Sequence, residues 1–319
     1  LITGNSPGND ARFYVEKCEA MRNFANKIWN ASRFVMMNLT IDHVELPEQL
    51  ELEDKWVLSK LNTLVKEVTD NMDAFEIGVA SAKVYDFIWD TYCDWFIELC
   101  KARLTGDDEC AKINAQNVLC YVLIETLKLL HPFMPFITEE LWQHIYDRKE
   151  GESLMVQQLN IPTACNEIIV KEFEVVKEVI GGIRTIRLQK NIAQKETLEL
   201  QVVGVNPVAT FNPVITKLCN LSSIEAVENK ADGSGSFMIG TTEYAIPLGN
   251  LINTEEELAK LEADLKYQEG FLQSVLKKLS NEKFVSKAPA NVIDMERKKQ
   301  ADAESKIASL KESIAALKK

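Results

Sequence analysis

One stretch near the start of the chain places amide and cationic side chains at the spacing of a single helical face. This face consists of Arg22, Asn23, Asn26, Lys27, Asn30, Arg33 and Phe34. Asparagine lowers the stability of a helix interior by about 0.5 kcal/mol relative to alanine, so helix formation does not explain three of them on one face. Amides and cations bind phosphates and read base edges, and an exposed aromatic ring stacks on an unpaired base. The stretch predicts a nucleic-acid contact; hydrogen bonding of the amides to a neighbouring buried loop is the alternative.

A second basic cluster lies near the end of the sequence. Between residues 277 and 299, seven basic residues stand against three acidic ones. The basic residues are Lys277, Lys278, Lys283, Lys287, Arg297, Lys298 and Lys299. Phe284 and Val285 add an apolar contact in the same segment. Such a cluster is suited to docking on the phosphates and a flat stacked surface of a folded RNA, whereas a solvated charged coil is the alternative.

The overall composition is that of a globular protein with an uneven charge distribution. The chain has 319 residues, of which 46% are hydrophobic, and a formal net charge of −12. Residues 41–160 carry ten basic and twenty-three acidic groups, so this acidic block is expected to face away from phosphates. No apolar run approaches the ~20 residues of a membrane-spanning helix, and no signal segment opens the chain. We therefore expect a cytoplasmic protein with no membrane contact.

The sequence assembles no catalytic or metal site. Seven cysteines are spread along the chain without a C-x-x-C pair, and we expect them to be buried, reduced thiols. The three histidines form no H-E-x-x-H pattern, and no glycine-rich phosphate-binding motif occurs. We expect neither a catalytic residue nor a metal nor a cofactor in this chain.

The elements that must position the first basic face are helices. Apolar periodicity predicts five of them, over residues 10–39, 54–72, 75–104, 106–130 and 135–146. In the first, the predicted buried stripe is Met21, Ala25, Ile28, Ser32, Val35 and Leu39. The third is apolar nearly all round, with a polar ridge of Asp86, Asp90 and Asp94, and is therefore central. Five helices with short connections predict an antiparallel bundle over residues 1–155.

Residues 156–251 predict a small α+β domain. Helices are expected over 167–188 and 213–221, and strands over 198–203, 224–227 and 237–246. From residue 252 a heptad pattern begins, broken between residues 280 and 290. Its apolar positions fall at 258, 261, 265, 272, 275 and 279 before the break, with polar Gln268, Glu296 and Gln300 on the seam. Two arms around one break predict an antiparallel coiled-coil hairpin over 252–319, and the fold class is mainly α.

Several motifs resemble one family of enzymes. Residues 3–10 and 22–34 resemble bacterial valyl-tRNA synthetases just after their class I catalytic core. Residues 131–142 (HPFMPFITEELW) resemble the turn and last helix of the anticodon-binding bundle shared by the valyl, isoleucyl and leucyl enzymes, and residues 182–187 (GIRTIR) resemble the stretch beyond it. The isoleucyl enzymes commonly end in a cysteine-ligated zinc module that this cysteine spacing cannot form. The heptad hairpin instead resembles the end of the valyl enzymes.

The resemblance implies that the chain is the non-catalytic C-terminal third of a longer enzyme. That enzyme would attach valine to tRNA-Val with ATP and Mg and edit mischarged tRNA, but no H-x-G-H or K-M-S-K-S signature occurs here. The expected partners are tRNA-Val and the chain's own upstream catalytic domain, with the protein a monomer. A helical or coiled-coil protein-interaction module, or the same region of an isoleucyl-type enzyme, is the alternative.

The resemblance also assigns the two basic surfaces to parts of the tRNA. The bundle would bind the anticodon, with Phe34 stacking on a base. The implied bundle contacts are Asn23, Lys27, Asn30, Arg33, Phe34, Trp95 and Lys101. The hairpin would embrace the outer corner of the tRNA, where the D and T loops meet. The implied contacts there are Lys277, Lys278, Lys283, Phe284, Lys287, Arg297 and Lys298.

Overall fold

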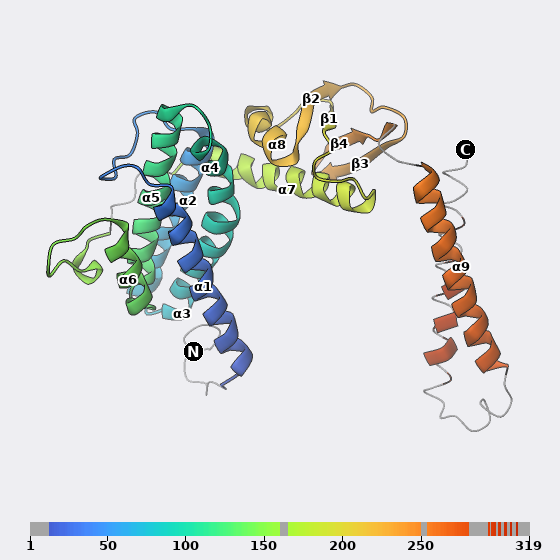
Figure 1. The fold of residues 1–319 in the computed structure, drawn as a ribbon, viewed down its shortest axis with the longest axis horizontal. Helices are drawn as coiled ribbons and strands as arrows, with labels where there is room; N and C mark the ends of the chain where they lie inside the picture. Colours follow the sequence, from blue (N-terminus) through green and yellow to red (C-terminus); the bar gives the residue numbers. More distant parts are fainter. Residues whose placement is uncertain are drawn as a thin grey trace.

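The computed structural model describes residues 13–159, 165–249 and 254–280, with scattered positions between 293 and 311. Helices make up most of this part, and a four-stranded sheet belongs to one small unit, so the predicted mainly helical class is confirmed. Figure 1 shows a helical bundle on the left, the sheet unit beside it, and the long helix α9 (Thr254–Leu279) at the opposite side of the view.

The bundle follows the predicted order of helices. Its elements are α1 (Val15–Met37), α2 (Leu52–Asp73), α3 (Ile77–Asp86), η1 (Phe87–Phe96), α4 (Ile97–Leu104), α5 (Glu109–Leu130) and α6 (Pro135–Ile145). The single helix predicted over 75–104 begins later, at Ile77, because Phe75 has a left-handed backbone with φ 60°. Its middle, η1, is a π-helix, a wider turn that is uncommon in proteins and recurs at functional sites.

Helix α1 runs parallel to the η1–α4 segment. The Lys27 ammonium lies 2.7 Å from the Asp94 carboxylate, which joins the middle of α1 to η1. Seven residues further along each segment, the Lys101 ammonium lies 5.8 Å from the centre of the Phe34 ring. Because both contacts advance in the same sense, the two segments point the same way.

Two other contacts fix α2 and α5 in the opposite direction. Just beyond the end of α1, the backbone N–H of Thr40 donates to Gln116 Oε1 near the start of α5, at 2.8 Å. At the end of α4, Arg103 pairs with Asp54 at the start of α2. The upper end of the bundle in Figure 1 therefore holds the ends of α1 and α4 and the starts of α2 and α5. The lower end holds the start of α1, the α2–α3 turn and the α5–α6 turn.

The buried stripe of α1 differs from the predicted one at its start. Ile28, Ser32 and Val35 are buried as predicted, but Met21 is 41% exposed and Phe24, outside the predicted stripe, is 1% exposed. Residues 13–23 are all exposed, which shows that the first turns of α1 extend beyond the bundle. Burial therefore starts at Phe24.

The sheet unit contains strands β1 to β4 in the order β2-β1-β4-β3, with β1 parallel to β2 and the other pairs antiparallel. The strands are β1 (Leu198–Val203), β2 (Leu221–Val227), β3 (Ser234–Ile239) and β4 (Thr242–Pro247). The one strand predicted over 237–246 is wrong, because these residues belong to the β3–β4 hairpin. Gly240, with φ +56°, supplies the left-handed turn between the two strands.

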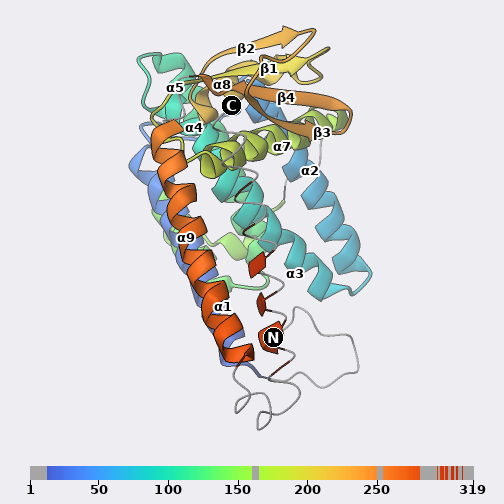
Figure 2. The ribbon, with the colours of Figure 1, turned by 90° about the vertical axis from the view of Figure 1, so that its right-hand side faces the viewer.

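Helix α7 (Glu167–Gln189) joins the bundle to the sheet unit. Its Phe173 ring stacks on Trp56 of α2, with ring centres 4.0 Å apart, and meets Phe211 beside helix α8 (Asn212–Cys219). The sheet lies along the same helix in both views (Figures 1 and 2). At Gly182, the Phe237 ring of β3 lies so close that an added methyl group would be 2.3 Å from it. The two units therefore share a packed helix.

The described part of the C-terminal arm agrees with the predicted antiparallel hairpin. Lys278 of α9 lies 3.8 Å from Glu296, and Glu269, earlier on α9, lies 3.0 Å from Lys311. The pairing runs in opposite directions on the two arms, as in an antiparallel coiled coil. The described seam positions are buried or half-buried: Leu265, Gln268, Leu272, Val275, Leu279, Ile293, Glu296, Gln300, Ala303 and Ile307. None of the described helices is long and apolar enough to span a membrane.

Candidate nucleic-acid interface

The amide face of α1 is open to solvent. Arg22, Asn23, Asn26, Asn30 and Arg33 are all exposed. Within the described residues, none of these five side chains forms a hydrogen bond or an ion pair. The alternative explanation, that the asparagine amides hydrogen-bond to a neighbouring buried loop, therefore finds no support among the described residues. The face offers amide donors and acceptors beside two cations, which is the chemistry of phosphate and base-edge recognition.

Lys27 lies on the same helix but already has partners on η1, at the surface of the bundle. Its ammonium is 2.7 Å from Asp94 and lies 3.7 Å from the centre of the Trp89 ring. Asp94 belongs to the polar ridge that was expected to face away from RNA, yet it lies against α1 and neutralises this lysine. Lys27 therefore links α1 to η1, and Asp94 neutralises the positive charge that it would offer to a phosphate.

Phe34 is half-buried, not fully exposed as the sequence predicted. One side of it packs against the core, and Lys101 approaches its ring at 5.8 Å while also pairing with Glu98. A ring that is fixed on one side and partly open on the other can stack on a base with little loss of side-chain entropy. Arg33, exposed and next in sequence, supplies a cation beside it at the upper end of the bundle.

Trp95 belongs to a separate place, at the junction with α7. Its ring meets Phe173 edge-on, with ring centres 6.0 Å apart, and the exposed Arg184 guanidinium lies 5.9 Å from its centre. Arg184 was not among the predicted contacts, although the GIRTIR motif contains it. The second arginine of that motif, Arg187, is buried and donates to the Glu196 carbonyl oxygen at 2.8 Å, so it holds the fold together.

A buried ion pair holds the upper end of the bundle. Both terminal nitrogens of Arg103 donate to Asp54, at 2.6 and 2.7 Å, and Asp54 is fully buried. Glu53 lies 3.5 Å from the same guanidinium; burial raises the pKa of this carboxyl, and the positive charge of Arg103 opposes that rise. No pattern in the sequence indicates this pair. It fixes the start of α2 against the end of α4, the segment that carries Lys101.

The arm presents part of its predicted basic tip. Lys277, Lys278 and Arg297 are exposed, and Lys278 shares the seam carboxylate Glu296 with Lys299. Within the described residues, Lys277 and Arg297 have no acidic partner. The remaining predicted contacts, Lys283, Phe284, Lys287 and Lys298, lie outside the described residues.

The cysteines are less uniformly buried than predicted. Cys100, Cys120 and Cys219 are buried and Cys93 half-buried, but Cys18, Cys110 and Cys165 are exposed. The exposed three lie at helix starts or in a loop, where no element covers them. Burial raises the pKa of the Cys120 and Cys219 thiols to about 11. Among the described residues, no group of His, Cys, Asp and Glu could hold a metal ion.

Comparison with known proteins identifies two matching families. Residues 54–202 match the anticodon-binding domain of tRNA ligases, and residues 253–318 match the valyl-tRNA synthetase tRNA-binding arm. The first match runs from α2 through the bundle, α7 and β1.

Three similar relatives are valine–tRNA ligases. The valine–tRNA ligase of Phocaeicola vulgatus is 73% identical over 312 residues, which is 98% of this chain and 35% of the relative. Those of Bacteroides thetaiotaomicron and Bacillus subtilis are 55% and 39% identical over 98% and 100% of this chain, and over 35% and 37% of their own lengths. The chain thus spans about a third of the length of the relatives it matches. It belongs to the valyl-tRNA synthetase family and corresponds to its C-terminal region, with the anticodon-binding domain and the tRNA-binding arm.

Proposed function

We propose that this chain binds tRNA-Val at two separate places. The anticodon would lie along α1 toward the upper end of the bundle, and the outer corner of the tRNA would lie against the arm. The observation that carries the proposal is the amide face of α1, on which every polar side chain except Lys27 is exposed and has no partner within the described residues.

In the bundle, Phe34 would stack on an anticodon base. Arg33, Asn30 and Asn23 would supply phosphate contacts and hydrogen bonds to base edges. Lys101 and Trp95 would lie at the margin of the site. Lys27 would act mainly by holding α1 in place.

In the arm, exposed cations would bind phosphates at the tRNA corner. Lys277, Lys278 and Arg297 stand exposed on α9 and on the facing arm. Lys283, Lys287 and Lys298 would extend this basic surface, and Phe284 would contact a flat stacked surface of the RNA.

The whole protein would attach valine to tRNA-Val with ATP and Mg and edit mischarged tRNA. ATP and Mg need phosphate-binding groups and carboxylates gathered in one site. Its sequence contains no class I ATP signature, and no described cluster of residues could hold a metal. Both would bind in the upstream catalytic domain, which is the second expected partner. We place the protein in the cytoplasm as a monomer, with domains over residues 1–155, 156–251 and 252–319.

Charge reversal on the arm tests the proposal most simply. Lys277→Glu with Arg297→Glu, and separately Lys283→Glu with Lys287→Glu, should each lower the affinity for tRNA-Val about tenfold at low salt. Each lost phosphate contact should also reduce the slope of log affinity against log salt by about one. Fluorescence anisotropy with labelled tRNA-Val and tRNA-Ile measures both quantities.

The matched control is Lys195→Glu with Lys217→Glu, which makes the same charge change on exposed residues of the sheet unit. It should change affinity little. Salt-independent binding, or equal losses in the control and arm variants, would support a protein-interaction module instead. Preference for tRNA-Ile would favour the isoleucyl alternative.

A further inference from the structure

A groove on the flank of the bundle lies apart from both surfaces proposed to bind tRNA. It encloses about 620 Å³ between α2, the α3–η1 segment and α7, a size typical of sites for small ligands. Its apolar lining comes from Leu64 and Phe87, which are buried in the core, and from Val170, which packs against that core. No described residue of α1 or of the arm lines it. The tRNA proposal therefore leaves this groove unused.

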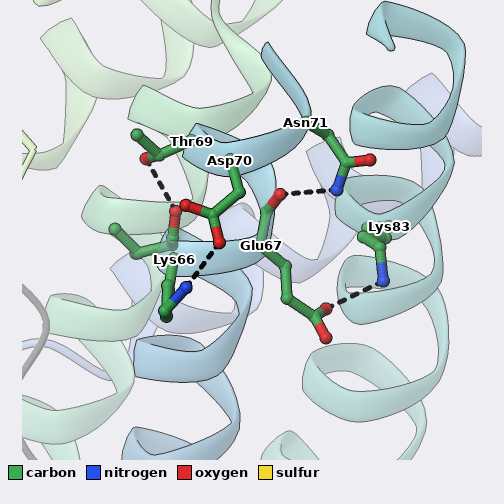
Figure 3. A network of polar contacts seen from close by, with 7 residues as sticks. Lys66, Glu67, Thr69, Asp70, Asn71 and Lys83 are labelled. Carbon is green, nitrogen blue, oxygen red and sulfur yellow. Dashed lines mark hydrogen bonds and ion pairs between the residues drawn. The ribbon is translucent and has the colours of Figure 1, made fainter. Parts of the chain in front are cut away.

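The lysines around the groove already have carboxylate partners. Glu174 of α7 lies 3.8 Å from the Lys60 ammonium of α2 and also pairs with Lys177. Glu67 of α2 lies 2.9 Å from the Lys83 ammonium of α3 (Figure 3). The positive charges of the groove are thus neutralised within the chain. An anionic ligand would have to compete with Glu67 and Glu174 for them.

Asp86 and Asp90 are acidic residues of the groove that stay unpaired. Both are exposed, and within the described residues neither forms a hydrogen bond or an ion pair. They lie four residues apart on one ridge, a spacing that places Cβ atoms roughly 5–6 Å apart on a helix. Two free carboxylates at this spacing suit a ligand that carries two positive charges.

Thr91, next to Asp90, brings a buried hydroxyl to the same groove. Its side chain is 9% exposed, and the hydroxyl has no hydrogen-bond partner within the described residues. Other threonines of the bundle and of α7 donate to the carbonyl oxygen four residues earlier; these are Thr63, Thr69, Thr105, Thr126, Thr138 and Thr185. Thr91 instead lies in the π-helix η1, whose wider turn changes this spacing. Buried polar groups in proteins usually have a partner, so this hydroxyl indicates a ligand in the groove.

We propose that the groove binds a linear aliphatic polyamine. Its ammonium groups would donate to the carboxylates of Asp86 and Asp90, and such charge-assisted hydrogen bonds are stronger than neutral ones. Putrescine and spermidine carry a four-carbon spacer between nitrogens, which suits two carboxylates one helical turn apart. The methylene chain would cover the apolar lining, and the Thr91 hydroxyl would accept a hydrogen bond from the ammonium beside Asp90. This site does not depend on tRNA binding.

Isothermal titration calorimetry of this chain with spermidine at low salt tests the proposal. We expect one molecule bound per chain, with a Kd below about 1 mM. Asp86→Asn with Asp90→Asn should weaken binding about tenfold, because both free carboxylates are lost. Since both residues are exposed, the melting curve followed by circular dichroism should stay unchanged.

The matched control is Glu199→Gln with Glu225→Gln, which removes the same charge from exposed residues of the sheet unit. This variant should bind spermidine as the parent chain does. Equal losses in the two double variants would show that spermidine follows net charge alone and would overturn the proposal. Binding of inorganic phosphate in place of spermidine would mean that the lysines set the preference of the groove, and it would overturn the proposal as well.

Methyl NMR places the ligand within the chain. Spermidine should shift the methyl signals of Leu64 and Val170 and leave that of Val205, which is exposed on the sheet unit, unchanged. Thr91→Val keeps the branched shape but removes the hydroxyl, so binding should weaken about threefold while stability stays equal or rises. Unchanged signals of Leu64 and Val170 in the presence of bound spermidine would place the ligand elsewhere and overturn the proposal.

Discussion

The two ends of the bundle differ in chemistry although the same helices build both. At the upper end, the cations Arg33 and Lys101 flank the half-buried Phe34, and the buried pair Arg103–Asp54 braces the helices. At the lower end, Phe75 and Phe136 face solvent from turns that carry almost no charge. Each helix runs from one end of the bundle to the other, so residues from its two ends lie on opposite ends of the bundle. The polar and apolar residues are therefore separated. The polar end suits RNA.

The largest effect should come from breaking the brace of the upper end. Arg103→Met leaves the Asp54 carboxylate buried without its partner, and such losses typically reduce stability by about 3–5 kcal/mol. Urea denaturation followed by circular dichroism measures the free energy of unfolding. A loss below about 1 kcal/mol would mean that the pair is not buried as described.

The matched control is an ion pair exposed on the bundle surface. Lys66 pairs with Asp70 on α2, beside the Glu67–Lys83 pair (Figure 3). Because Lys66 is exposed, Lys66→Met should leave the urea midpoint nearly unchanged. If Lys66→Met lowered the urea midpoint as much as Arg103→Met does, burial would not explain the importance of the Arg103–Asp54 pair.

A smaller difference in stability is expected between alanine substitutions at two adjacent glycines of α7, the helix that carries Arg184. Gly182→Ala would bring a methyl group within 2.3 Å of the Phe237 ring and should lower stability by about 1–3 kcal/mol. Gly181→Ala meets no atom within 4 Å and should be neutral or stabilising by up to about 1 kcal/mol. Thermal melts of both variants show whether packing of the sheet unit on α7 supports the upper end of the bundle. Equal effects would mean that α7 and β3 are not tightly packed.

Substitution of Phe34 should change stability least among these variants. It should nevertheless clearly weaken binding of the anticodon stem-loop. Phe34→Leu keeps apolar packing against the core but removes the ring, so the melting temperature should change little. Affinity for an anticodon stem-loop of tRNA-Val should fall about tenfold, the lower range for loss of one base–aromatic stack. Titration of the labelled stem-loop measures this. Unchanged affinity with a lowered melting temperature would make Phe34 a core residue only.

Local patterns in the sequence predicted the helices and the coiled-coil seam well. The heptad positions of the arm, including polar Glu296, lie on the seam wherever the structure describes them. Most of the α1 stripe is also correct, because one helical period determines which residues share a face. The β3–β4 hairpin was missed because the turn at Gly240 interrupts a run that otherwise resembles one strand.

Contacts between distant segments could not be predicted in the same way. Lys27 and Asp94 are 67 residues apart, and Arg103 and Asp54 are 49 apart. Sequence spacing grouped Lys27 with the free cations of α1, and it placed Asp94 on a polar ridge expected to face away from RNA. Only the packing of α1 on η1 shows that the two neutralise each other. The exposure of Phe136 likewise depends on where the α5–α6 turn lies.

A footprint of this chain with and without the anticodon stem-loop of tRNA-Val tests directly whether the anticodon binds at α1. Hydroxyl-radical labelling resolves both ends of the bundle in one experiment. We predict protection of Arg33 and Phe34 at the upper end and unchanged labelling of Phe75 and Phe136 at the lower end. Protection of the lower end with the upper end unchanged would contradict the assignment of the anticodon to α1.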